Sequence, residues 1–244
     1  MQNDNVESII QKAKEYEKKY EWLQATEYYQ KAKDLVLNEK DVLRATKYQE
    51  RLGYCFYRAA FQVESNIEFK KHLTYSNEAY KKELQMLKDS TQENKQIRIT
   101  QIQGLIAFIQ SRYETNPSKK KELLDKWWTL EHNALEYYEK TGDFHSAAKI
   151  HNDLIEFWQY DYIWLIRNHS EMQKKAEELR NLAEKAIEIL SKLDDNYELA
   201  RAYCLASWGF GWGEWATTSP DQIVHYNKKC NIYSKQAMKL AKKT

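Results

Sequence analysis

Apolar residues recur along the chain at intervals of three and four positions, the spacing of one face of an α-helix. Short polar clusters at 38–41, 89–94, 141–143 and 194–196 interrupt this pattern and divide the chain into five segments of similar length. A weaker polar break inside each segment separates two helical stretches. The pattern therefore predicts an all-α protein of about five antiparallel helical hairpins. The expected hairpins are 5–38, 41–89, 92–140, 143–192 and 195–243.

A small residue recurs at one phase of the second helix in every predicted hairpin. These residues are Ala32, Ala79, Ala134, Ala186 and Ala237. A large apolar or aromatic residue stands four positions before each alanine, and residues four apart share a helix face. A small side chain at a fixed phase lets a neighbouring helix approach closely, as stacked hairpins require. This column of equivalent alanines indicates an internal repeat.

Three stretches of the chain resemble tetratricopeptide repeats. YEWLQATEYYQKAKDL at 20–35 resembles the second helix of such a repeat, TGDFHSAA at 141–148 resembles its turn and the following helix start, and RLGYCFY at 51–57 resembles a first helix. The repeats here are about 50 residues long, whereas those of the family have about 34. The long helices also resemble the SNAP-type adaptors of vesicle fusion. The resemblance implies one domain over 1–244, a right-handed TPR-like α-solenoid.

Charge and cysteine content indicate which partners the protein could bind and in which cellular compartment it is expected. The formal charge is +2, from 38 basic and 36 acidic residues, so no strong field would steer nucleic acid to the protein. Three widely spaced cysteines fit neither a disulfide framework nor a paired metal knuckle. No apolar run is long enough to cross a membrane. We therefore expect a cytoplasmic protein that binds no nucleic acid and does not insert into membranes.

The sequence lacks the familiar catalytic patterns for a helical protein. No histidine has an acidic residue three positions before it, so the Glu-x-x-His pairs of di-iron bundles are missing. The zinc-peptidase, phosphate-loop and nucleophile-elbow patterns are also missing. His145, His151 and Glu156 could approach a common metal site, but structural histidines on amphipathic helices are commoner. We predict no catalytic residue, no metal and no cofactor.

The glycine-rich stretch GFGWG at 209–213 lies inside a predicted helix, where each glycine costs about 1 kcal/mol relative to alanine. Gly209 and Gly213 continue a stripe of small residues, next to a stripe that contains Trp208, Trp212 and Trp215. Two interpretations remain open. The tryptophans either fill the core of a tightly packed helix or form an aromatic surface for a ligand.

In the resembled family, peptides lie along the concave surface made by the first helix of each repeat. The residues carried over to this surface, which become more apolar along the chain, are Tyr54, Tyr57, Arg58, Phe108, Phe157, Trp158, Trp208 and Trp212. An exposed apolar groove of this kind would bind protein. The same residues would instead form the core if the helices curl into a tight superhelix, and the sequence leaves both possibilities open.

Several functional hypotheses follow from the repeat and the missing catalytic patterns. The first is a non-catalytic scaffold that binds a peptide or a partner helix on its concave surface. The second is a small-ligand sensor or enzyme with an aromatic pocket in which Arg58 holds an anion. In a third, the chain is the TPR-like portion of a longer signalling protein, and its end hairpins could self-associate because no polar capping helix is evident.

Overall fold

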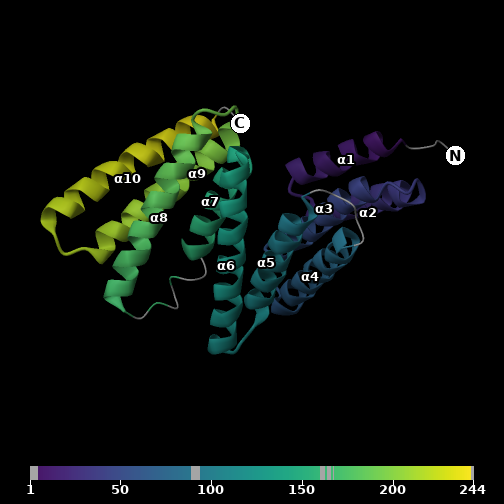
Figure 1. Cartoon of the computed structure of the whole chain (residues 1–244), viewed down its shortest axis with the longest axis horizontal. Coiled ribbons are helices and arrows are strands. Elements are labelled where there is room, and N and C mark those ends of the chain that lie inside the picture. The colour runs from purple at the N-terminus through teal and green to yellow at the C-terminus, as the bar shows by residue number, and fades with distance from the viewer. Residues whose placement is uncertain (1–4, 89–93, 160–162, 164–165, 167, 243–244) are drawn as a thin grey trace. The chain divides into compact units, whose positions relative to one another are not determined.

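The computed structural model describes residues 5–88, 94–159, 163, 166 and 168–242, and every regular element in this part of the chain is a helix. The all-α prediction is confirmed for these residues. The α-helices, drawn in Figure 1, are α1 (Val6–Lys18), α2 (Trp22–Asn38), α3 (Val42–Ala60), α4 (Asn66–Lys88), α5 (Lys95–Tyr113), α6 (Pro117–Thr141), α7 (Phe144–Phe157), α8 (His169–Leu190), α9 (Asn196–Ala216) and α10 (Pro220–Ala241).

The predicted polar clusters supply the caps that begin three of these helices. Asp41, Asp143 and Asp195 precede α3, α7 and α9, and each side chain accepts a hydrogen bond from a backbone N–H of the first turn. Such a cap satisfies a donor that the helix itself leaves unpaired. The remaining cluster, 89–94, lies outside the described residues except for Asn94, which precedes α5 without a side-chain cap.

The ends of α1, α2 and α6 share one backbone turn. Tyr20, Lys40 and Gly142 have φ values of 60°, 62° and 76°, and the next residue donates its N–H to a carbonyl five positions earlier. This left-handed closure satisfies carbonyls at a helix end and reverses the chain. Glycine adopts such a φ without strain, so Gly142 is the favourable residue of the three.

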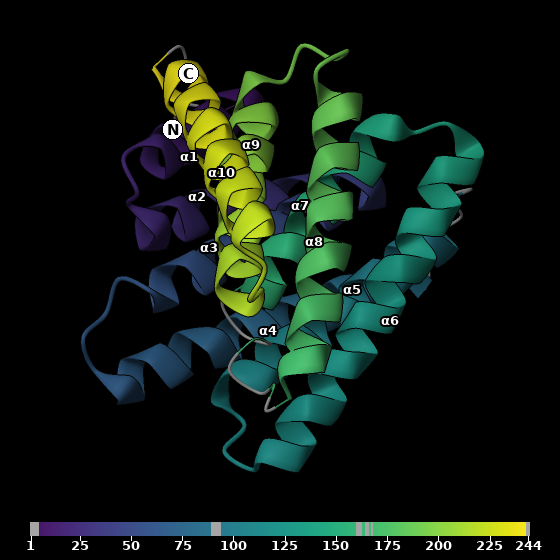
Figure 2. The ribbon, with the colours of Figure 1, turned by 90° about the vertical axis from the view of Figure 1, so that its left-hand side faces the viewer.

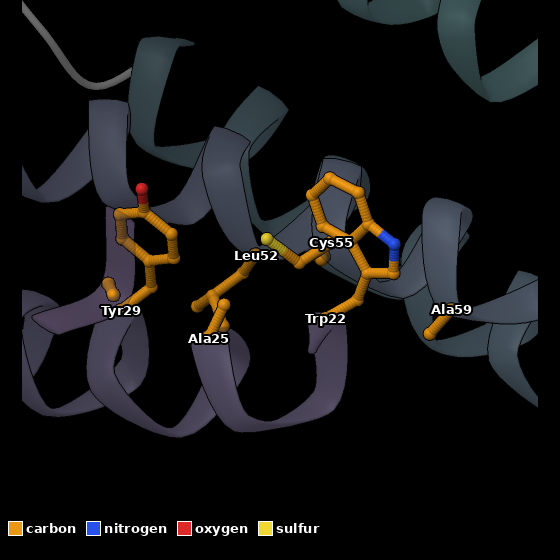
Figure 3. Close-up of a cluster of buried hydrophobic side chains, with 8 residues drawn as sticks. Trp22, Ala25, Tyr29, Leu52, Cys55 and Ala59 are labelled. Atoms are coloured by element: carbon orange, nitrogen blue, oxygen red, sulfur yellow. The ribbon is translucent and has the colours of Figure 1, made fainter. Parts of the chain in front are cut away.

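The chain forms two compact units, unit 1 (1–130) and unit 2 (131–244), and the boundary falls within α6. In unit 1, α1 packs against α2, α2 against α3, α3 against α4, and α4 against α5. A buried cluster joins α2 to α3: Trp22, Ala25 and Tyr29 face Leu52, Cys55 and Ala59, as Figure 3 shows. The alanines between the larger side chains let the two helices approach closely.

In unit 2, α7 packs against α8, α8 against α9, and α9 against α10, which lies along one side of α9 in Figure 2. Ala148, Ala186, Leu190 and Ala202 form a fully buried cluster from three of these helices. By contrast, α10 has no buried residue.

The alanine column predicted from the repeat is buried at four of its five positions. Ala32, Ala134 and Ala186 have no exposed surface, and Ala79 is 6% exposed. Ala237 is only half-buried because it lies on α10, where one flank alone is covered. The spacing of small residues thus marks buried faces of α2, α4, α6 and α8.

The carboxyl group of Glu83, on α4, is buried in unit 1, and its pKa therefore depends on the packing of this helix. The Glu83 side chain has no exposed surface, and Arg98 reaches its Oε1 at 3.2 Å while binding Glu50 at 2.6 Å. Burial, reinforced by the charge of Glu50 and opposed by Arg98, raises the pKa of Glu83 to about 9. Glu83 is therefore protonated at neutral pH in the folded protein and ionised in the unfolded chain.

Folding therefore takes up a proton at Glu83, and stability falls as pH rises from about 4.5 to about 9. We expect Glu83→Gln to remove this contribution, so that the variant gains stability relative to the wild type as pH rises through that window. Urea unfolding followed by tryptophan fluorescence at pH 5, 7 and 9 measures the difference. Glu78→Gln, at an exposed position of the same helix, is the control. Equal pH slopes for wild type and Glu83→Gln would refute the assignment.

Candidate functional site

The eight predicted site residues fall into two groups, one in each unit. Tyr54, Tyr57, Arg58 and Phe108 lie in unit 1, on α3 and α5. The other group, Phe157, Trp158, Trp208 and Trp212, lies in unit 2, at the end of α7 and on α9. The two groups have different environments and are described in turn.

In unit 1, Arg58 of α3 lies over two aromatic rings. Its guanidinium carbon is 5.2 Å from the centroid of Trp22 and 5.9 Å from that of Tyr54. The two rings contact each other edge-on, at 5.8 Å between centroids. Stacking on an aromatic face orients the guanidinium and leaves its N–H edge able to donate. Within the described residues, Arg58 forms no ion pair with a carboxylate.

A second aromatic group joins α3 to α5. The ring of Tyr57 lies 5.9 Å from Phe108 and 5.0 Å from Phe61, which is 51% exposed. Arg112 of α5 covers this group: its guanidinium carbon is 4.9 Å from the Phe108 centroid and 5.4 Å from that of Phe61. Arg112 also donates to the Tyr57 hydroxyl at 3.3 Å. Two predicted residues from different hairpins are thus brought together.

We call the half-buried and exposed members of these two groups the aromatic–arginine surface: Tyr54, Tyr57, Arg58, Phe61, Phe108 and Arg112. The sequence analysis missed Phe61 and Arg112. A signal was present, because each stands four positions after a predicted residue, Tyr57 or Phe108, and therefore shares its helix face.

In unit 2, Phe157 and Trp158 are not available to a partner. Their side chains are 3% and 1% exposed, because α7 is covered by α8 and α9. The predicted binding role of these two residues is therefore wrong in this structure, and they belong to the core. The sequence had one sign of this, since the segment around them is apolar on most sides.

The tryptophans of α9 are more accessible. Trp208 is 47% exposed, Trp215 is 70% exposed, and Trp212 is half-buried with its ring 5.8 Å from that of Trp215. The interpretation in which these tryptophans fill the core is therefore wrong for Trp208 and Trp215. Whether they bind a ligand stays a prediction.

One glycine of α9, Gly213, leaves room for an arginine from α8. A Cβ atom at Gly213 would lie 2.3 Å from Arg180 Nη1 and 3.2 Å from the Tyr226 ring. The guanidinium of Arg180 is 4.6 Å from the centroid of Tyr226 on α10. The absence of a side chain at Gly213 thus leaves room for the Arg180 guanidinium where it stacks on the Tyr226 ring.

The three residues considered for a metal do not converge. His145 binds Asp195 at 2.8 Å, His151 lies beside Glu139, and Glu156 pairs with Arg201. Within the described ranges, no group of three or more histidine, cysteine, aspartate or glutamate side chains could hold a metal ion. The metal alternative therefore has no geometry to support it there.

None of the helices in the described part of the chain is both long and apolar enough to span a membrane.

Known proteins provide a likeness in fold. No protein-family model matches the chain, and no curated protein matches its sequence. Among solved structures, the chain is similar to BtubC (BKLC) from P. vanneervenii, with a TM-score of 0.51 at 14% identity. The match covers 97% of this chain and 79% of BtubC. At this identity the likeness concerns the helical fold alone.

Proposed function

We propose that this protein is a non-catalytic scaffold, a right-handed TPR-like stack of helical hairpins that binds a peptide segment on the aromatic–arginine surface of unit 1. The observation that carries the proposal is the meeting of Tyr57 and Phe108, from alternate helices, beside two stacked guanidinium groups. Alternate helices are the ones that line the concave face of a hairpin stack. Because the three cysteines are free thiols, the proposal places the scaffold in the reducing cytoplasm.

The chemistry of the surface defines the peptide. Exposed aromatic rings favour apolar side chains, because their burial on binding removes apolar area from water. The Arg58 guanidinium is oriented by Trp22 and Tyr54 and has a donor edge that suits a carboxylate. We therefore expect a peptide in which an acidic residue lies close to one or two aromatic or aliphatic residues.

Selection from a random peptide display library against the full chain tests this function. We expect enriched sequences to combine acidic and apolar residues, and a synthetic version to bind in fluorescence anisotropy. Arg58→Ala should weaken that peptide about ten-fold or more, the loss expected for a charge-assisted hydrogen bond.

Arg44→Ala is the matched control, since Arg44 lies on the same helix but is already paired with Glu7, Glu39 and Asp41. This variant should bind the peptide as tightly as the wild type. Library selection without enrichment, or equal affinity for Arg58→Ala and wild type, would refute the proposed surface.

A further inference from the structure

Unit 2 contains a pocket that the proposed scaffold function does not use. It has a volume of about 410 Å³ and lies among α6, α7 and α8. This volume is in the range of small-molecule sites, about 300–1,000 Å³. Leu135 of α6 and Leu182 of α8 provide its apolar lining.

A buried imidazole lines this pocket without a hydrogen-bond partner. His151 of α7 is 1% exposed, and both of its ring nitrogens lack a partner. Glu139 Oε1 lies 3.5 Å from Nε2, which is too long for a hydrogen bond. Burying a polar group unpaired costs free energy, so such groups in native proteins normally have a partner. A ligand in the pocket would supply one.

One face of α8 adds polar groups of both signs. Lys174, Glu177, Asn181 and Lys185 follow one another at intervals of three and four residues and line the pocket. Lys185 also contacts Glu139, whereas Lys174 and Glu177 form no ion pair with another described residue. The pocket therefore offers ammonium and amide donors for an anionic group and a carboxylate for a cationic group.

We propose that this pocket binds a small zwitterion of the free amino acid type. Its carboxylate accepts hydrogen bonds from Lys174, from the Asn181 amide and from an N–H of His151. Its ammonium group donates to Glu177. A simple anion fits the lining less well, because the two lysines are balanced by the carboxylates of Glu177 and Glu178.

The protonation state of His151 agrees with this arrangement. The titratable groups that act on it are Glu139 and His132 from α6 and Lys185 from α8, and Lys174, Glu177 and Glu178 of α8 line the same pocket. The pKa of His151 is lowered to about 4, mainly by burial. The nearby Lys185 and His132 also lower it, whereas Glu139 opposes the shift. A neutral imidazole has one donor and one acceptor nitrogen, so it can donate to the ligand without carrying a charge.

Titration of the full chain with each standard amino acid, followed by the imidazole signals in ¹H–¹³C NMR and by calorimetry, tests the proposal. We expect one or a few amino acids to bind and to shift the His151 signal. For the best of these, the N-acetyl form lacks the cationic group and the amide form lacks the anionic group, so both should bind at least ten-fold more weakly. Failure of every amino acid to shift His151 overturns the proposal.

Variants of Lys174 and Glu177, at the rim of the pocket, should change the affinities of the three compounds in a pattern that a loss of folding cannot produce. Lys174 and Glu177 are exposed, so their replacement should leave the fold intact. Glu177→Gln should weaken the amino acid about ten-fold and leave its N-acetyl form unaffected, whereas Lys174→Met should weaken the amino acid and leave its amide form unaffected. Equal effects on all three compounds would contradict the proposed contacts.

His151→Leu should abolish binding, and His145→Gln, on the same helix but paired with Asp195 outside the pocket, should not. If binding of the amino acid persists in His151→Leu with unchanged affinity, the site is not this pocket. This test is independent of the scaffold proposal, because Arg58→Ala in unit 1 should bind the amino acid like the wild type.

Discussion

Replacing Gly53 with alanine is expected to destabilise the protein by about 1–3 kcal/mol, although alanine is the better helix former by about 1 kcal/mol. An added Cβ would lie 2.8–2.9 Å from three ring atoms of Tyr80. Tyr80 is 4% exposed and its ring is rigid, so α3 and α4 would have to separate. The hydrogen bond from Ser76 Oγ to the Gly53 carbonyl, 2.7 Å long, would be strained by that movement.

Urea or thermal unfolding followed by circular dichroism measures this change. Gly211→Ala is the control, because Gly211 also lies within a helix, α9, but no atom apart from its chain neighbours and the backbone of its own helix lies within 4 Å of its added Cβ. This control should gain up to about 1 kcal/mol from helix propensity. If Gly53→Ala is as stable as Gly211→Ala, the close approach of Tyr80 to α3 is not present in solution.

The second large effect is expected at Arg201, which joins α9 to α7. Its guanidinium contacts Asp153 at 2.6 Å, Glu198 at 3.2 Å and also Glu156. The Arg201 side chain is 21% exposed and that of Glu198 only 8%. Arg201→Met keeps the length of the side chain but leaves three carboxylates close together. We expect a loss of about 2 kcal/mol, less than for a fully buried cluster, because the Asp153 and Glu156 side chains are 50% and 45% exposed.

Low pH should reduce this loss, because the repulsion among carboxylates that have lost their cation weakens when one of them takes up a proton. Unfolding free energies of wild type and Arg201→Met should therefore converge as pH falls from 7 toward 4. Arg44→Met is the matched control: Arg44 also contacts three carboxylates, but at the surface, where ion pairs contribute little. Equal losses for the two variants would contradict the role of burial at Arg201.

Parts of the candidate site could be predicted from the sequence, and parts could not. The register carried from the repeat placed Tyr57 and Phe108 on helix faces that meet, since periodicity along one helix defines a face. The same register included Phe157 and Trp158, which are buried. Periodicity alone does not distinguish a face that is covered by another helix from one that is open.

The pocket of unit 2 also could not be predicted from local sequence patterns. His151 was noticed for its chemistry, but its neighbours Glu139 and Lys185 lie 12 and 34 positions away in the chain. Only packing among α6, α7 and α8 brings them together. Likewise, GFGWG could be identified as costly for a helix, whereas the neighbour that occupies the space beside Gly213 is Arg180, a residue of the preceding helix.

The sequence by itself determined the helices and their approximate limits, because caps, turns and apolar periodicity act between residues a few positions apart. Asp41, Asp143 and Asp195 begin helices through hydrogen bonds that span three residues. The tertiary structure decided which faces are covered, which charges meet at Arg201 and where His151 is left unpaired. Those features depend on contacts between distant residues, whose free energies depend on burial and on the local dielectric environment.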